Sequence, residues 1–203
     1  MAVQLSPLRQ PMGIFNNFIF PQQQEVVVDE KGVSLTGDSF RISLIDGTPL
    51  LKVQGKFFSF RQRKEVYDLS DRHLFTIRAK ASSIIRATYW VEDPSENFLM
   101  EVKFSASKFI GEKATITFSS ASGKAETLEL KADWRSKNGE IKDLDTGATV
   151  ARISRQSTVK HYFADAQTYI VAVAPGMDAA LVTAMCIALD EKNEIGKAAA
   201  ASS

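Results

Sequence analysis

This chain contains little cysteine and histidine, and neither positive nor negative charge predominates in it. One cysteine in 203 residues excludes an internal disulfide framework, and Cys186 lies in an apolar segment, as is typical of a small core side chain in a reducing compartment. Lys plus Arg (25) nearly balance Asp plus Glu (24), so the net charge of +1 gives no nucleic-acid signature. The composition predicts one intracellular domain without a nucleic-acid partner.

Motifs for catalysis and metal binding are also missing. The two histidines, His73 and His161, are far apart in sequence, and no second His or Cys accompanies either of them. The triplet Asp-Thr-Gly at 145–147 resembles an aspartic-protease loop, but that chemistry needs two carboxylates that share a proton and no second triplet occurs. We interpret it as a hairpin turn, and we expect no enzymatic activity, no catalytic residue, no metal and no cofactor.

A nearly unbroken apolar segment, YIVAVAPGMDAALVTAMCIAL, occupies residues 169–189. A helix that is apolar on all faces must be buried on all faces, in protein or in lipid. Pro175-Gly176 breaks the segment, and a carboxylate such as Asp178 costs about 2.5 kcal/mol or more at the centre of a bilayer. We therefore predict no transmembrane segment, but a strand at 169–173 and a buried helix at 178–190, with Asp178 as N-cap and an exit to water at Asp190-Glu191.

From Glu25 onward, apolar and polar residues alternate in short stretches separated by turn residues. This period of two predicts strands with one apolar face, and we expect ten to twelve of them before the helix. Hairpin turns are predicted at Asp46-Gly47, Asp93-Pro94, Ser122-Gly123, Asn138-Gly139 and Thr146-Gly147.

Strands with one apolar face and a helix that is apolar on all sides can bury each other's apolar surface. Closing the sheet around the helix removes exposed sheet edges, and the helix fills a lumen too wide for side chains alone. We therefore predict a mainly β fold, a closed antiparallel barrel of about twelve strands wrapped around one buried C-terminal helix, as a single domain at 25–194. Residues 1–24 are predicted to be a mobile arm, with docking of its apolar knot at 14–20 as the alternative, and residues 195–203 a disordered tail.

Several short motifs follow one another in an order that resembles a known family. They are Phe40-Arg41-Ile42, Asp46-Gly47 with the PLLKV stretch at 49–53, Ser59-Phe60-Arg61 leading to Lys64, the stretch 74–78, Trp90, the VARI stretch at 150–153, Tyr169, and the PGMD stretch at 175–178. Together, over about residues 26–191, they resemble the LURP-one-related family of the tubby C-terminal-like superfamily. The resemblance implies a twelve-stranded barrel around a hydrophobic C-terminal helix.

The resemblance also bears on function. The superfamily includes tubby-like proteins, which are membrane-tethered regulators that bind phosphoinositides, and phospholipid scramblases, while plant members of the family are associated with pathogen defence. No residue of this chain aligns with the phosphoinositide-binding bases of tubby, and one cysteine with a broken apolar tail argues against scramblase activity.

A basic segment offers the candidate site. Between Lys52 and Arg86 the chain has nine bases and three acids. Bases that converge on one surface hold an inositol phosphate through charge-assisted hydrogen bonds. The alternative is a solvated outer face of the barrel, paired with Glu65, Asp68 and Asp71. The candidate lipid-headgroup residues are Arg61, Arg63, Lys64, Arg78, Lys80 and Arg86, and nearby Trp90 is either an interfacial anchor or a rim residue.

Two functions of different classes follow. The first is a non-enzymatic module that binds lipid headgroups (phosphoinositides) or a membrane surface, as a membrane-tethered regulator does. The second is a protein-interaction scaffold in stress or transcriptional signalling, without lipid binding, whose arm contacts a protein partner through residues 15–20. We expect a monomer in the cytoplasm that lies at membrane surfaces or shuttles to the nucleus.

Overall fold

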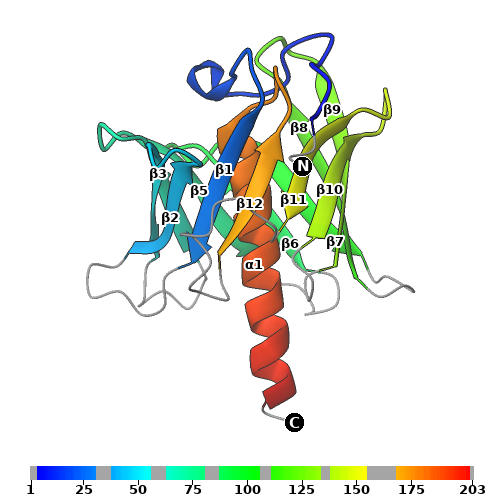
Figure 1. Ribbon diagram of the computed structural model, residues 1–203. Helices are drawn as coiled ribbons and strands as arrows, with labels where there is room; N and C mark the ends of the chain where they lie inside the picture. The colour runs from blue at the N-terminus through cyan, green and yellow to red at the C-terminus, as the bar shows by residue number, and fades with distance from the viewer. Residues whose placement is uncertain are drawn as a thin grey trace.

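Twelve antiparallel strands form a closed barrel around one helix, as predicted (Figure 1). The computed structural model describes residues 4–30, 38–55, 63–80, 87–105, 111–133, 138–154 and 168–201. Each strand pairs with its neighbours in sequence, and β1 pairs with β12 to close the ring. The elements are η1 (Asn16–Phe18), β1 (Gln24–Glu30), β2 (Asp38–Leu44), β3 (Pro49–Gly55), β4 (Arg63–Tyr67), β5 (His73–Lys80), β6 (Thr88–Glu92), β7 (Phe98–Ser105), β8 (Glu112–Ser119), β9 (Ala125–Asp133), β10 (Asn138–Asp143), β11 (Thr149–Ser154), β12 (Thr168–Val173) and α1 (Ala179–Ala201).

The chain connections alternate between two ends of the barrel because consecutive strands are antiparallel. We name the end where α1 begins the upper end, and the end where α1 leaves the barrel the lower end (Figure 1). The upper turns are residues 45–48, 68–72, 93–97, 120–124, 144–148 and 174–178. Except for Ala87 and Gly111, the six segments that join strands at the lower end lie outside the described residues.

Four of the five predicted hairpin turns are confirmed, at 46–47, 93–94, 122–123 and 146–147. The prediction for Asn138-Gly139 is wrong, since both residues belong to β10. Gly139 is paired with Ala132 of β9, and a Cβ atom at Gly139 would lie 2.8 Å from the Cβ of Ala132. The glycine therefore permits a close approach of two strands instead of a turn.

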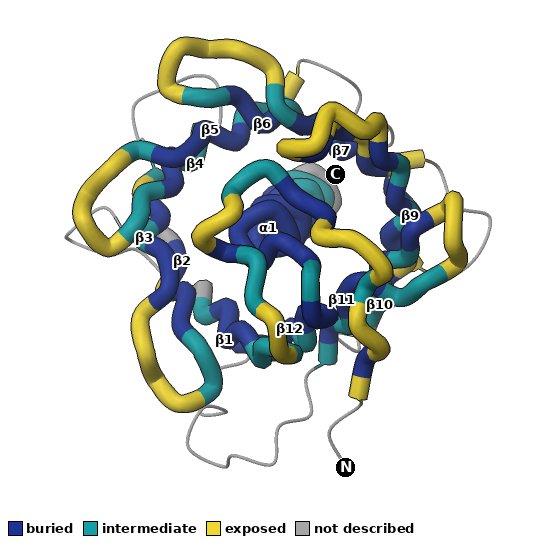
Figure 2. The backbone as a smooth tube through the Cα atoms, turned by 90° about the horizontal axis from the view of Figure 1, so that it is seen from above, coloured by how far each residue is buried: buried dark blue, intermediate teal, exposed yellow. Residues whose placement is uncertain are grey.

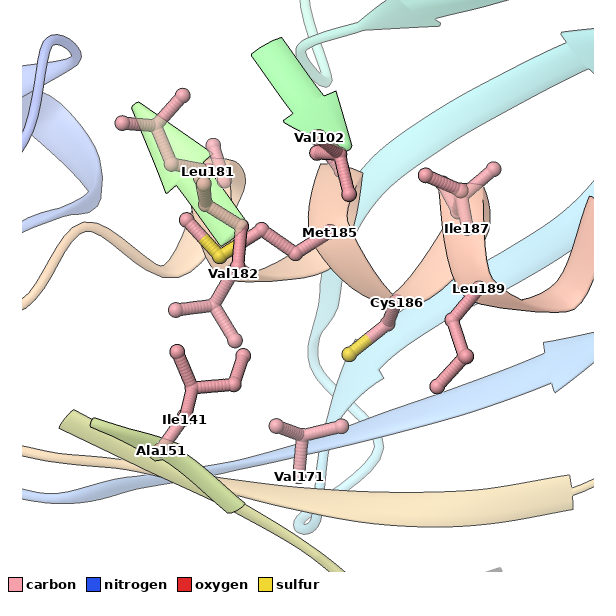
Figure 3. Packing of buried hydrophobic residues seen from close by; sticks show 14 of the residues in the cluster. Val102, Ile141, Ala151, Val171, Leu181, Val182, Met185, Cys186, Ile187 and Leu189 are labelled. Carbon is pink, nitrogen blue, oxygen red and sulfur yellow. The ribbon is translucent and has the colours of Figure 1, made fainter. Parts of the chain in front are cut away.

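The core lies between the inner wall of the barrel and α1. Inward residues of β8 are buried while the alternate residues are exposed, which is the pattern of a strand with one dry face. Figure 2 shows α1 inside the ring of strands. The helix residues Ala179 to Leu189 are all at most 1% exposed, and Figure 3 shows Val182 pointing toward Ile141 of β10. An all-round apolar helix is thus stabilised by wall contacts on every side.

The start of α1 agrees with the sequence prediction, whereas its end does not. Asp178 is the N-cap, because its Oδ1 accepts hydrogen bonds from the N–H groups of Ala180 (2.9 Å) and Leu181 (3.2 Å). The helix continues past residue 190 to Ala201 and projects beyond the lower end (Figure 1), so residues 195–201 of the expected disordered tail are helical. No helix in the described part of the chain is long and apolar enough to cross a membrane.

The predicted exit to water at Asp190-Glu191 is wrong. Asp190 is 2% exposed and accepts a hydrogen bond of 2.6 Å from the hydroxyl of Tyr169, and Glu191 is 8% exposed and forms an ion pair of 3.0 Å with Lys64. The barrel wall supplies partners for both acids, so they are buried without remaining unpaired.

The N-terminal arm, residues 4–23, packs across the upper end. Its backbone bonds to the segment that leads into α1: the N–H of Met12 donates to the carbonyl of Gly176 (2.8 Å), and the N–H of Gly176 donates to the carbonyl of Phe20 (2.9 Å). Phe18 is buried, so the apolar knot docks on the domain, which is the alternative that the sequence left open. Oδ2 of Asp178 accepts the N–H groups of Ile14 (3.0 Å) and Phe15 (2.7 Å), which ties the arm to the helix.

Candidate functional site

Three of the six predicted site residues share the outer face of the barrel wall. Arg63 of β4 and Arg78 of β5 are cross-strand partners, and Lys80 lies two residues further along the same face of β5. All three lie toward the lower end. Arg61 and Arg86 lie outside the described residues.

Lys64 does not join this group. Side chains alternate along a strand, so Lys64 points to the opposite face from Arg63 and enters the barrel. Its Nζ lies 5.6 Å from the ring centroid of Phe40 and forms the ion pair with Glu191 of α1. Lys64 therefore holds the helix where it leaves the barrel, and its inclusion among surface ligand-binding bases is corrected.

The outer bases have acidic or aromatic neighbours. Arg78 forms an ion pair with Glu92, Arg63 approaches Glu96 at 3.8 Å, and Nζ of Lys80 lies 4.4 Å from the ring centroid of Trp90. These acids come from β6 and the turn after it, not from the segment 65–71 that the sequence analysis named. Of that segment, Asp68 binds Arg72, Asp71 binds Lys52, and Glu65 accepts the hydroxyl of Tyr67.

Two polar atoms in this group have no hydrogen-bond partner in the described part of the chain. They are Nε of Arg63 and Oε2 of Glu92, and both are buried. The contact of Arg63 with Glu96 is long, at 3.8 Å, and its Nε is too deeply buried for a surface ligand to reach. Any contact of Arg63 with an anionic ligand is therefore made by its terminal guanidinium nitrogens.

Trp90 lies on the outer wall at the middle of β6. Its indole N–H donates to Glu101 of β7 (3.0 Å), and its ring contacts Phe98 edge-on at a centroid distance of 6.3 Å. Its side chain, stacked by Lys80 and bonded to Glu101, therefore belongs to the wall and not to the rim.

A pocket of about 710 Å³ lies at the upper end, between the arm and two hairpin turns. Residues 7–12 of the arm form one side, and residues of the turns at 120–124 and 144–148 and their flanking strands form the other. Carboxylate oxygens of Glu126, Asp143 and Asp145 lie within 4.8 Å of one another on that second side. Nζ of Lys124 lies 2.8 Å from Glu126 and 3.4 Å from Asp145, and the pairing with Glu126 and then Asp145 raises the pKa of Lys124.

Sequence reasoning missed this acidic group. Its members come from β9, β10 and the following turn, at spacings that match no motif, and Asp145 was interpreted only as a turn residue. The turn itself is confirmed, since Asp143 accepts the N–H of Asp145 (3.0 Å). Chemically, two carboxylates that hold one ammonium group, with a third carboxylate close by, form a cation-binding arrangement.

Acids are concentrated in the upper turns of the barrel. The six upper turns contain seven of the chain's 24 acids and two of its 25 bases, which leaves 23 bases against 17 acids elsewhere. The sequences of the six segments that join strands at the lower end contain nine Lys or Arg and one Asp. An almost neutral chain is therefore acidic at the upper turns and basic in the rest.

A closed antiparallel barrel around a central helix, with charged surfaces on its outside, defines the class of this protein and fits the tubby-like superfamily. The sequence pattern described as LURP-one-related matches residues 24–190, and the chain belongs to this family.

Relatives agree with this assignment. The chain is 24% identical over 183 residues to Protein LURP-one-related 15 of Arabidopsis thaliana, covering 88% of this chain and 84% of that protein. Protein LURP-one-related 10 of the same plant is 21% identical over 182 residues, covering 87% and 94% respectively. An X-ray structure of an Arabidopsis thaliana protein has the same fold, with a TM-score of 0.56 at 16% identity, covering 89% of this chain and 97% of that one.

Proposed function

We propose that this protein is a non-enzymatic module that binds anionic phospholipid headgroups, phosphoinositides among them, through the lower half of the barrel. The observation that carries the proposal is the division of charge between the ends. Acids collect in the upper turns, and the strand connections at the other end contain nine bases and one acid. A basic end directed at an anionic leaflet, with an acidic end directed away, gives both attraction and a single orientation.

The described residues supply part of such a surface. Arg63, Arg78 and Lys80 lie side by side on the outer wall toward the lower end, and the contact of Arg63 with Glu96 is long, at 3.8 Å. Glu92 and Glu96 reduce the local charge, so these three bases alone give modest binding. Arg61 and Arg86 are the further bases that we propose for the same surface. At about 1 kcal/mol for each base near an anionic leaflet, four or five bases correspond to recruitment in the micromolar range.

The second candidate, a scaffold that binds partners through residues 15–20 of the arm, has less support. Phe18 is 7% exposed, and the arm's backbone is bonded to residues 175–178, so this apolar surface is largely occupied by the protein itself. The relatives' names describe no activity that favours either candidate. We further propose that the protein is a cytoplasmic monomer that lies at membrane surfaces.

Vesicle co-flotation tests the proposal. The purified chain is floated with neutral, phosphatidylserine and phosphatidylinositol-bisphosphate vesicles at low and physiological salt, beside an Arg63→Gln/Lys80→Gln variant. We expect binding to anionic vesicles that weakens with salt, because exposed charges are screened. Removing two bases at about 1 kcal/mol each predicts a loss of about 30-fold in partitioning.

A matched control comes from the upper end. Arg9→Gln/Arg72→Gln removes the same charge from exposed residues of the arm and of the turn at 68–72, and it should leave flotation unchanged. Circular dichroism verifies that both variants are folded. The proposal fails if wild-type protein ignores anionic vesicles at low salt, or if the control variant loses as much binding as the lower-end variant.

A further inference from the structure

The pocket at the upper end combines features that favour a protein partner. One side is the arm, which contributes the apolar residues Pro7, Leu8, Pro11 and Met12 together with Arg9 and Gln10. The opposite side carries the carboxylates of Glu126, Asp143 and Asp145. A pocket with apolar residues on one side and three carboxylates on the other has the chemistry to hold an amphipathic segment whose positive charge is directed away from Arg9 and toward the carboxylates.

The surface beyond the pocket has the same two properties. Among the described residues the large exposed apolar side chains are Leu69 (49%), Phe98 (55%) and Leu144 (52%), and all three lie in or next to upper turns. Leu144 does not line the pocket, but it directly precedes Asp145, which does, so its exposed side chain lies on the surface beside the pocket. In Figure 2, which views the barrel from above, the exposed turns form a ring around the arm and α1. These three side chains lie on separate turns, so only Leu144, which is next to the pocket, bears on the pocket's partner.

The binding arrangement for a positive group is already present. Two of the three carboxylates hold the ammonium group of Lys124, whose side chain is 47% exposed. Only the ammonium group of Lys124 contacts these carboxylates, and the aliphatic part of its side chain is flexible. A Lys or Arg side chain of a partner can therefore displace it without moving the backbone.

We propose that this surface docks a basic, amphipathic segment of a protein partner, with one Lys or Arg side chain entering the group of Glu126, Asp143 and Asp145. Leu144 and the arm's Pro7–Leu8 contact the apolar face of that segment, and the acidic upper turns attract its remaining charges. The inference does not rest on lipid binding, since the two surfaces lie at opposite ends of the barrel.

A synthetic 14-residue helix of Leu and Lys serves as the probe, with a helix of Leu and Glu as its charge control. Fluorescence anisotropy of the labelled peptides is measured against the full chain. We expect the Lys peptide to bind and the Glu peptide not to bind. Leu144→Ser/Asp145→Asn should weaken binding of the Lys peptide about tenfold, from the loss of one charge and one apolar contact.

Two further variants separate docking from unspecific attraction. Leu69→Ser/Asp71→Asn makes the same change of charge and apolarity in the turn at 68–72, away from the pocket, and should alter binding less than about twofold. Lys124→Gln removes the internal competitor and should tighten binding several-fold, an effect that a merely structural lysine would not produce.

Three results would contradict the proposal, because each would assign the surface to something other than a basic peptide segment. Equal weakening in the 144–145 and 69–71 variants would indicate unspecific attraction to an acidic surface. Binding of calcium alone, measured by calorimetry, without binding of the Lys peptide would indicate a metal site instead. Self-association in analytical ultracentrifugation that is lost in Leu144→Ser would assign the surface to a second copy of the chain.

Discussion

Asp178 makes contacts that join segments more than 160 residues apart. One carboxylate oxygen caps α1 through Ala180 and Leu181, and the other accepts two consecutive N–H groups of the arm. Burial raises the pKa of Asp178 to about 6, although the four backbone N–H donors act in the opposite direction. The carboxylate is therefore ionised at neutral pH. It lies at the upper end of the barrel, between the arm and α1.

A pH dependence follows from that raised pKa. Between about pH 4 and pH 6 the folded protein holds a proton on Asp178, while the unfolded chain, with an ordinary value of 3.8, does not. The folded state therefore binds more protons in this window, and the contribution of Asp178 to the free energy of unfolding increases as pH falls. We expect wild type to gain up to about 3 kcal/mol relative to Asp178→Asn between pH 7 and pH 4, measured by urea unfolding.

The comparison with Asp178→Asn removes the effects of other groups. Asp46, Asp68 and Asp93 have lowered pKa values because backbone and side-chain groups donate hydrogen bonds to them, and they destabilise both proteins equally at low pH. A difference between the two proteins that stays constant from pH 7 to pH 4 would contradict the assignment to Asp178.

At the scale of an element, α1 acts as the interior of the barrel. Ala184 is fully buried, at 0% exposure, within the hydrophobic core cluster. We expect Ala184→Glu to prevent folding, because burying an unpaired carboxylate costs more than the few kcal/mol of a domain's stability. Ala125→Glu, at an exposed position at the start of β9, introduces the same side chain and should change the unfolding midpoint little. Circular dichroism of both purified variants is the measurement.

A folded Ala184→Glu protein with a normal unfolding midpoint would mean that α1 leaves the barrel without loss of the strands. That result would contradict the view that wall and helix stabilise each other.

At the scale of the whole molecule, the barrel and helix form one cooperative unit. Every strand pairs with two neighbours, and the ring closes only when β1 meets β12, which lies more than 130 residues later. In the described part of the chain, buried residues of the strands, the arm and α1 belong to one hydrophobic cluster. We expect a single unfolding transition, with coincident urea curves from far-UV circular dichroism and tryptophan fluorescence. Separate midpoints for the two signals would reveal a part that unfolds independently.

The amino-acid sequence by itself determined the architecture. Strand alternation, the all-round apolar segment at 179–189 and the acid before it were sufficient for a barrel around a helix capped by Asp178. These properties follow from local periodicity and from the need to bury apolar surface, both of which can be read along the chain.

Only the tertiary structure decided which charges act together. It turned Lys64 inward to Glu191 while its neighbour Arg63 faces out, it gave the buried Asp190 a tyrosine partner, and it assembled the carboxylates around Lys124. It also collected the acidic turns at one end. The spacing of charged residues along the sequence does not identify their partners, because each pairing depends on strand register and on the end of the barrel at which a connection lies. Strand register and the position of each connection are set only when the barrel closes.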